Sequence, residues 1–169
     1  MPIYLIGFMG SGKTTIGKKL ANKLGFQFVD LDALFEKTLQ MSILDYFEKF
    51  GESEFRKEER KILQKSFELS KAVISCGGGT PCFFDNMELI NKNGISIYIE
   101  MSAASLNYRL KNAKTQRPII VKMNDDELTN FIGSELMKRE VYYKKSKIIV
   151  KGESINIADL ISRIESEKL

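Results

Sequence analysis

Residues 7–15 of the chain read Gly-Phe-Met-Gly-Ser-Gly-Lys-Thr-Thr, which is the spacing of a phosphate-binding loop. Gly7 and Gly12 stand five positions apart and are followed by Lys13 and Thr14. Glycine lets the backbone wrap a polyphosphate, the lysine ammonium can reach the β- and γ-phosphate oxygens, and the threonine hydroxyl can ligate magnesium. We therefore expect a nucleoside triphosphate to bind here. The alternative is a plain glycine-rich turn between a strand and a helix.

The sequence on either side of the loop predicts the elements that hold it. Residues 3–7 form a short apolar run typical of a strand, and residues 14–24 carry apolar side chains at helical spacing before Gly25. In such a unit the backbone N–H groups and the helix N-terminus converge on an anion. The candidate nucleotide contacts in the loop are Gly10, Ser11, Gly12, Lys13, Thr14 and Thr15.

Two carboxylates follow the next apolar segment. Residues 26–30 predict a second strand, which ends in Asp30-Leu31-Asp32 beside the expected phosphate loop. Asp30 could hold through water the Mg²⁺ that Thr14 ligates. Asp32 could bind an acceptor hydroxyl and take its proton, because kinases orient a nucleophile in this way. The alternative is a strand end at which Asp32 only caps the following helix.

The rest of the chain alternates strands with helices. Further strands are predicted at residues 72–76, 95–100 and 147–151. Predicted helices cover residues 31–39, 42–50, 52–70, 85–93 and 102–111, then run from a cap at Asp125 or Asp126 to about residue 145, and start again at Asn156. Gly51 is expected to end the helix that Ser42 and Asp45 open with a capping box. This alternation predicts an α/β three-layer sandwich with a five-stranded parallel sheet and ligands at the carboxyl ends of the strands.

Residues 112–124 have neither a helical nor an alternating pattern, and they contain Arg117 followed by Pro118. Proline disfavours a helical backbone at the residue before it, so Arg117 is expected to be extended. A loop of this length within a compact domain is usually functional. An extended loop could carry Arg117 to a transferring phosphoryl group once both substrates are bound, which would exclude water.

Composition limits the class of protein. A chain of 169 residues fits one domain, spanning residues 1–169, and no apolar stretch is long enough for a membrane span. The net charge of +4 is spread over the chain, so we expect neither nucleic acid nor a membrane as partner. Nothing in the sequence requires more than a monomer.

The chain has two cysteines, Cys76 and Cys82, and no histidine. A disulfide scaffold and a zinc site are therefore not expected, which favours a cytoplasmic location. The lack of histidine also excludes catalytic triads of the Ser-His-Asp and Cys-His types. Any general base must be a carboxylate, a lysine, a tyrosine or a cysteine.

This sequence lacks the signature motifs of other classes of nucleotide-binding protein. A guanine-binding switch uses Asn-Lys-x-Asp, whereas the nearest string is Asn-Lys-Asn-Gly at residues 91–94. A motor or transport ATPase would end a later strand in an acidic pair, whereas residues 72–76 lead into the glycines 77–79. A small phosphotransferase remains, and it needs a second pocket for an acceptor.

With six segments taken together, the chain resembles the shikimate kinases. The segments are GFMGSGKTT at 7–15, VDLD at 29–32, GESEFRKEE at 51–59, SCGGG at 75–79, QRP at 116–118 and KREVYY at 138–143. Their order and spacing match the family over nearly the whole chain. The resemblance implies a P-loop NTPase fold of the nucleoside monophosphate kinase type. It also implies Mg²⁺-dependent transfer of the γ-phosphoryl group of ATP to the 3-hydroxyl of shikimate, in chorismate and aromatic amino acid biosynthesis.

The resemblance also implies roles for individual residues. Asp32 would bind the ring hydroxyls and act as the base, Arg56 and Arg139 would clamp the carboxylate, and the Gly78 backbone would contact the substrate. Arg117 would close over the phosphates on a lid at about residues 112–124. The acceptor-binding region would be about residues 31–60.

The residues themselves support these roles and leave some choices open. A hydroxylated carboxylate needs a guanidinium fork, and Arg56 and Arg60 lie one turn apart on the same predicted helix. Glu59 is placed to fix the rotamer of Arg56; the resemblance, not the spacing, selects Arg56. For Arg139 the alternative is a solvated helix face. Arg109 is a candidate to pack on the adenine, or else a surface arginine.

Two other functions are kept as alternatives. One is a kinase for another small hydroxy acid such as gluconate, and the other is a non-catalytic nucleotide-binding protein. A mere binder would not need an acceptor carboxylate, a guanidinium clamp and a lid arginine together.

Overall fold

The computed structural model describes residues 1–113, 120 and 122–167. The strands are β1 (Ile3–Ile6), β2 (Gln27–Asp30), β3 (Ala72–Ser75), β4 (Ile95–Glu100) and β5 (Ile148–Lys151). The helices are α1 (Lys13–Leu24), α2 (Leu31–Leu39), α3 (Ile43–Ser66), α4 (Asn86–Asn93), α5 (Ala103–Lys111), α6 (Asp125–Tyr143) and α7 (Ile157–Ser166), with a 3₁₀-helix η1 (Thr80–Cys82).

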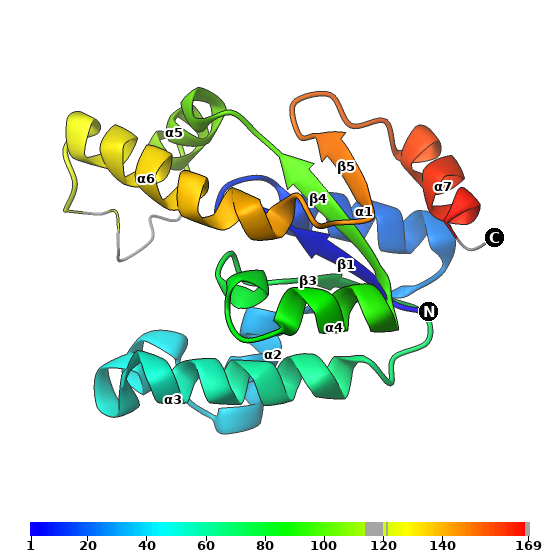
Figure 1. The fold of residues 1–169 in the computed structure, drawn as a ribbon, viewed down its shortest axis with the longest axis horizontal. Coiled ribbons are helices and arrows are strands. Elements are labelled where there is room, and N and C mark those ends of the chain that lie inside the picture. The colour runs from blue at the N-terminus through cyan, green and yellow to red at the C-terminus, as the bar shows by residue number, and fades with distance from the viewer. Residues whose placement is uncertain (114–119, 121, 168–169) are drawn as a thin grey trace.

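The strands form one parallel sheet in the order β2-β3-β1-β4-β5. Figure 1 labels four of these strands, β3, β1, β4 and β5. Every strand predicted from the sequence is present, with bounds within one residue of the prediction. The fold is therefore the predicted α/β sandwich around a five-stranded parallel sheet. Because all strands run the same way, the loops after β1, β2 and β3 meet at one edge of the sheet.

Alternating strand residues supply two hydrophobic clusters, one on each face of the sheet. Ile3 and Leu5 of β1 pack with Leu20 of α1 and Ile164 of α7. Their neighbours on β1 face the other way, into the larger cluster that includes residues of α2, α3, α4, α5 and α6. This arrangement fixes α1, and with it the loop before α1, against the central strand.

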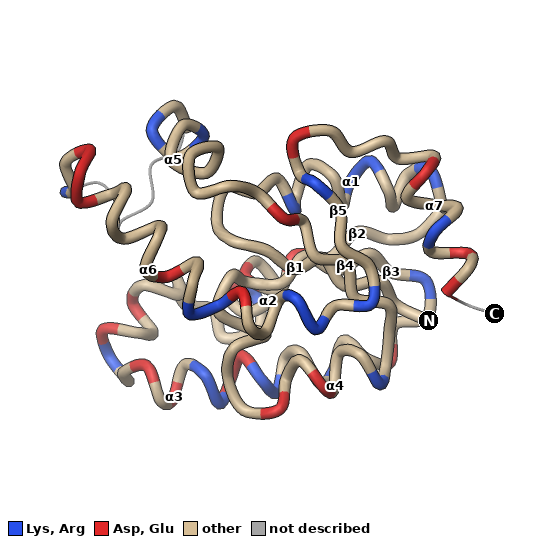
Figure 2. The backbone as a smooth tube through the Cα atoms, turned by 45° about the horizontal axis from the view of Figure 1, so that its top comes forward, with Lys and Arg blue, Asp and Glu red and all other residues tan. Residues whose placement is uncertain are grey.

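Helix α3 is interrupted at Gly51, where φ is 81° and ψ is 171°. The helical backbone is broken at Gly51, as predicted. Helical hydrogen bonding resumes directly after Gly51, and this second part ends at Ser66 rather than at the predicted Ser70. Ser42 caps the first part by accepting from the Asp45 N–H at 3.0 Å. Figure 2 shows Lys and Arg interspersed with Asp and Glu along α3, as expected for a solvated helix face.

Two details of the helices differ from the sequence predictions. The N-cap of α6 is Asn124, not Asp125 or Asp126, because the Asn124 side chain and Glu127 form a reciprocal capping box. The 3₁₀-helix η1 was not predicted and follows directly after the glycines 77–79. No helix in the described part of the chain is long and apolar enough to cross a membrane.

Candidate active site

A cavity of about 490 Å³ lies at the carboxyl ends of β1, β2 and β3. It is bordered by the glycine loop, by both aspartates of the second strand end and by the glycines after β3. The lining residues are Met9, Gly10, Gly12, Lys13, Thr14, Thr15, Asp30, Asp32, Ser75, Cys76, Gly77, Gly78, Arg109, Leu110, Ala113 and Ile120. The cavity thus joins segments far apart in the sequence, as the parallel topology predicts.

The glycine loop has the backbone that a phosphate site requires. Gly10 (φ 81°) and Gly12 (φ 93°) adopt left-handed conformations that favour glycine. Gly12 is the N-cap of α1 and has no side chain to cap it, so the first N–H groups of the helix are left for an anion. Lys13 Nζ donates to the carbonyls of Gly7 at 2.8 Å and Phe8 at 2.9 Å, which holds its ammonium over the loop.

Thr14, in the first turn of α1, lies close to Asp30, the last residue of β2. Asp30 Oδ2 lies 3.4 Å from Thr14 Oγ1, while Oδ1 accepts the N–H groups of Asp32 at 3.1 Å and Ala33 at 3.3 Å. Asp30 is therefore the N-cap of α2, and the alternative in which Asp32 caps that helix is wrong.

Hydroxyl and carboxylate oxygens beside a phosphate loop fit Mg²⁺. This ion keeps several waters and usually takes only one or two protein ligands in addition to substrate phosphates. Among the described residues there is no cluster of three or more potential metal-binding side chains. The donor set thus suits an ion that arrives with a nucleotide rather than one held in a protein cage.

The carboxylate of Asp32, in the first turn of α2, lies against Gly77. A methyl group built at Gly77 would lie 2.9 Å from Asp32 Oδ1. Asp32 and Lys13 line the same cavity. A carboxylate and a phosphate-loop lysine in one cavity can serve an acceptor hydroxyl and a phosphoryl donor respectively.

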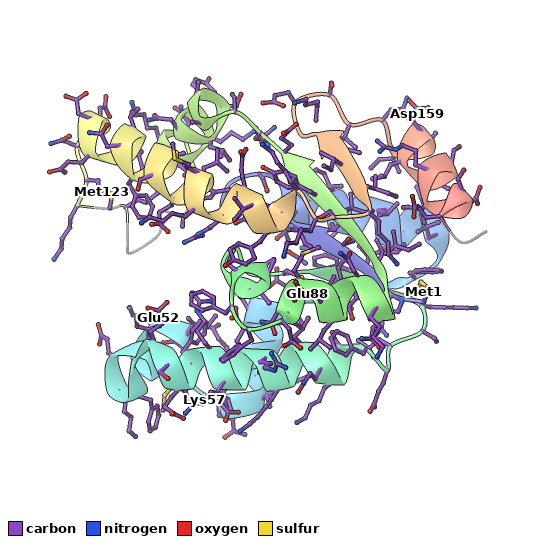
Figure 3. All side chains as sticks on the ribbon, in the orientation of Figure 1. Met1, Glu52, Lys57, Glu88, Met123 and Asp159 are labelled. Atoms are coloured by element: carbon purple, nitrogen blue, oxygen red, sulfur yellow. The ribbon has the colours of Figure 1, made fainter. Side chains whose placement is uncertain are left out.

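Arg56 projects from α3 toward Gly79. A methyl group built at Gly79 would lie 2.7 Å from Arg56 Nη2 and 2.8 Å from Nη1. The expected partner is present, because Arg56 Nη1 donates to Glu59 Oε2 at 2.9 Å. Glu59 is itself buried and accepts from Thr80 Oγ1 at 2.6 Å. Glu52, labelled in Figure 3, adds a carboxylate 3.5 Å from Arg56 Nε.

Arg60 points elsewhere and forms an ion pair with Asp85, which holds the pKa of that carboxyl below its usual value. Its guanidinium lies 5.1 Å from the centre of the Phe84 ring. Of the two arginines left open by the sequence, Arg56 is therefore the one beside the glycines that follow β3.

Arg139 is not on a solvated helix face. Its side chain is only 19% exposed, its guanidinium lies 5.2 Å from the centre of the Phe8 ring, and a methyl group built at Gly78 would lie 3.2 Å from Nη1. Nη2 donates to Glu135 Oε2 at 2.9 Å. Hydrogen bonds from Lys138 and the charge of Arg139 lower the pKa of Glu135, so this carboxylate is a stable anionic partner.

Tyr143, one turn after Arg139, holds the backbone of Gly78 in place. Its hydroxyl donates to the Gly78 carbonyl at 2.5 Å. Burial raises the pKa of Tyr143, so it remains a donor. Gly78 is thereby held beside the cavity, next to both Arg139 and the backbone of the phosphate loop.

Arg109 borders the cavity from α5, where Nη1 donates to the Ser11 carbonyl at 3.3 Å. It also borders a second cavity of about 470 Å³, which is lined mainly by residues of α5. Arg109 therefore lies at the phosphate loop rather than on an unrelated surface. Arg117 and most of the expected lid lie outside the described residues.

The two cysteines lie near these charges but are not nucleophiles. Burial raises the pKa of the Cys76 thiol well above its ordinary value. Burial also raises the pKa of Cys82 to about 11, against the opposing effect of Arg139 and Arg56. Both thiols stay protonated at neutral pH, and the reactive species of cysteine is the thiolate.

Several residues around the site were not predicted from the sequence. Thr80 binds Glu59, Phe83 stacks on Arg56, and Phe8 lies under Arg139. The sequence signal that could have indicated such contacts is the aromatic pair Phe83-Phe84, a few residues after the glycines.

The fold and this site together define a P-loop kinase: a parallel sheet with a glycine phosphate loop and a cavity lined by a carboxylate, with two guanidinium groups at the glycines beside that cavity. Residues 9–167 match the family model described as shikimate kinase. The chain belongs to the shikimate kinase family and is an enzyme of that class.

Relatives and solved structures agree with this assignment. The chain is 42% identical to the shikimate kinase of Phocaeicola vulgatus over 153 residues, which is 90% of this chain and 87% of that relative. The structure of shikimate kinase from Bacteroides thetaiotaomicron has a TM-score of 0.92 at 38% identity, covering 100% of this chain and 99% of that one. Shikimate kinase from Acinetobacter baumannii in complex with shikimate has a TM-score of 0.83 at 29% identity, covering 99% and 94%.

Proposed function

We propose that the residues gathered at this edge of the sheet transfer the γ-phosphoryl group of ATP to the 3-hydroxyl of shikimate. The activity is that of the family, and the observation that carries the assignment of residues is the run Gly77–Gly79. Each of its glycines abuts a different charged side chain: Asp32 at Gly77, Arg139 at Gly78 and Arg56 at Gly79. A carboxylate suited to hydroxyls and two guanidinium groups suited to an acid thus lie along one three-residue segment beside the phosphate loop.

The reaction follows from the placement of these groups. The N–H groups at the start of α1 and the Lys13 ammonium bind the phosphates of ATP. Arg56 and Arg139 bind the carboxylate of shikimate through paired hydrogen bonds, and the Gly78 backbone contacts the substrate. Asp32 accepts the proton of the 3-hydroxyl as its oxygen bonds to the γ-phosphorus, and the bond to ADP breaks.

Thr14 and, through water, Asp30 are the residues that would hold Mg²⁺, which neutralises phosphate charge when bound. Arg109 and Arg117 belong to the nucleotide side of the site. Arg117 stabilises the transferring phosphoryl group as the loop at about residues 112–124 closes and excludes water. Residues 31–60 form the acceptor-binding region of a single domain, 1–169. The chain acts as a monomer in the cytoplasm, which sedimentation at working concentration and fractionation of cells test directly.

The test is a coupled ADP-release assay with ATP or GTP and a panel of hydroxy acids that includes shikimate and gluconate. Shikimate with ATP should give by far the highest kcat/KM. Lys13→Ala and Asp32→Asn should each lower kcat by about 100-fold or more, because each removes a group that acts in the transition state.

Lys19→Ala, an exposed lysine on the same helix as Lys13, is the matched control and should retain full activity. Circular dichroism should show that all variants are folded. Near-native kcat in a Lys13 or Asp32 variant would remove that residue from its role, and a higher kcat/KM for gluconate would reassign the acceptor.

A further inference from the structure

We propose that Phe83 is a positioning residue for the acceptor clamp, and that it holds the Arg56 guanidinium by its aromatic face. This inference rests on the proposed role of Arg56 in binding the substrate carboxylate. The guanidinium carbon of Arg56 lies 4.0 Å from the centre of the Phe83 ring, well within the range of a cation–π contact.

The surroundings of Arg56 explain why such a contact matters. Glu59 and Glu52 both approach the guanidinium, at 2.9 Å and 3.5 Å, and the arginine side chain is only 14% exposed. Both carboxylates compete with the substrate carboxylate for the same N–H groups. An aromatic face attracts the cation without occupying any N–H group, so it can hold the guanidinium in place and leave an edge free for paired hydrogen bonds.

A second ring completes the support. The centre of the Phe55 ring lies 4.9 Å from the same guanidinium carbon. Arg56 Nε is buried and lies 3.5 Å from Glu52 Oε1 without forming a hydrogen bond within the described ranges, so the packing of the two rings contributes to the orientation of this part of the side chain. Excluding water also strengthens the attraction between Arg56 and a bound carboxylate, because the local dielectric constant falls.

The segment after the glycines is built to hold Phe83 in this position. Thr80 Oγ1 donates to Glu59 Oε1 at 2.6 Å, and Asn86 Nδ2 donates to the Thr80 carbonyl at 2.8 Å. Both bonds are buried: the first ties η1 to α3, the helix that carries Arg56, and the second ties η1 to the start of α4. The backbone that carries the Phe83 ring is therefore fixed relative to Arg56.

The next residue provides a natural comparison. Phe84 has a left-handed backbone, with φ 53°, and its ring lies beside Arg60 instead, 5.1 Å from the guanidinium carbon. Arg60 is paired with Asp85, whereas the three atoms nearest to a methyl group built at Gly79 all belong to Arg56. Adjacent phenylalanines thus contact adjacent arginines, of which only Arg56 faces the glycine run.

The experiment compares Phe83→Leu, which keeps apolar volume but removes the π face, with Phe83→Tyr, which keeps it. Phe83→Leu should raise KM for shikimate about 5- to 30-fold, the range expected for a shielded cation–π contact, with kcat and KM for ATP within about twofold. Phe83→Tyr should restore KM to near the native value. Phe84→Leu is the matched control and should leave all three constants unchanged. Phe83→Met serves in place of Phe83→Leu if the latter does not fold.

A double-mutant cycle separates this inference from the proposed function. In an Arg56→Ala background, Phe83→Leu should change kcat/KM for shikimate by less than about twofold, since the ring acts through the arginine. An undiminished effect there, or a native KM in Phe83→Leu while Arg56→Ala is impaired, would overturn the role of Phe83 alone. A native KM in Arg56→Ala would overturn the clamp itself.

Discussion

At the scale of single residues, the glycines after β3 are defined by what surrounds them rather than by backbone strain. Gly79 has an ordinary φ of −87°, so alanine would not be strained there. The added methyl group would instead meet the two terminal nitrogens of Arg56. These nitrogens are the far end of a flexible side chain, which can move aside without disturbing the core.

We therefore expect Gly79→Ala to impair substrate binding without unfolding the protein. Displacement of the clamp should raise KM for shikimate about 10-fold or more, because a paired hydrogen bond to a carboxylate depends on its geometry. KM for ATP and the melting temperature should change little. Steady-state kinetics and thermal melts measure these quantities.

Gly133→Ala, on α6, is the control, since nothing lies within 4 Å of a methyl group built there. It should leave both KM values unchanged. An unchanged KM for shikimate in Gly79→Ala would show that Arg56 does not bind the acceptor from its present position.

Contacts between residues close in the sequence could be predicted, whereas contacts between residues far apart in the sequence could not. The ion pair between Arg56 and Glu59 was predictable because residues three apart share a helix face. The bond between Thr80 and Glu59 joins residues 21 positions apart, and no spacing rule relates them. The choice between Arg56 and Arg60 likewise depended on where η1 and Asp85 lie, which the sequence does not encode locally.

At the scale of elements, α3 depends on a glycine that breaks its helical backbone. Gly51 adopts φ 81° and ψ 171°, a region nearly restricted to glycine, and nothing lies within 4 Å of a methyl group built there. The interruption lets the turns before and after Gly51 differ in direction. Tyr46 and Phe50 pack against each other before it, whereas Phe55 and Arg56 face the core and the site after it.

Gly51→Ala should lower the free energy of unfolding by about 1–3 kcal/mol through backbone strain alone. Urea denaturation measures the change. Gly133→Ala is again the comparison and should be neutral or stabilising by up to about 1 kcal/mol, because alanine is favoured in a helix interior. Equal stabilities for the two variants would mean that residue 51 is not held in this conformation.

Element types were predictable, but some of their ends were not. Apolar periodicity located every strand of the sheet and the helices between them. The start of α6 was misplaced because Asp125, Asp126 and Asn124 are all good caps, and only the reciprocal bonds with Glu127 decide among them. The 3₁₀-helix was missed because a single short turn has no periodic signal.

At the scale of the whole molecule, the site exists because the chain returns repeatedly to one edge of the sheet. The order β2-β3-β1-β4-β5 places the strand of the phosphate loop beside the strand that ends in the glycine run. Parallel strands and their ligand edge were predictable from the alternation of elements. The strand order was not, because many orders are compatible with the same alternation.

The reactivity of the Cys82 thiol shows whether the segment after the glycine run is packed against the rest of the protein. Burial raises the pKa of Cys82 to about 11, so at pH 8 almost none of it is thiolate, and reactivity should appear only as the pH approaches 11. Iodoacetamide at pH 8 should therefore modify Cys82 in the folded protein on the order of 100-fold more slowly than in denaturant. Mass spectrometry of timed samples measures both rates. Equal rates would show that the segment after the glycine run is open.

Identification by ³¹P NMR of the product formed from ATP, Mg²⁺ and shikimate tests the assigned reaction. We expect one new phosphomonoester, on the 3-hydroxyl, in an amount equal to the ADP formed. Esterification of a different hydroxyl, or ADP released at the same rate without shikimate, would contradict it.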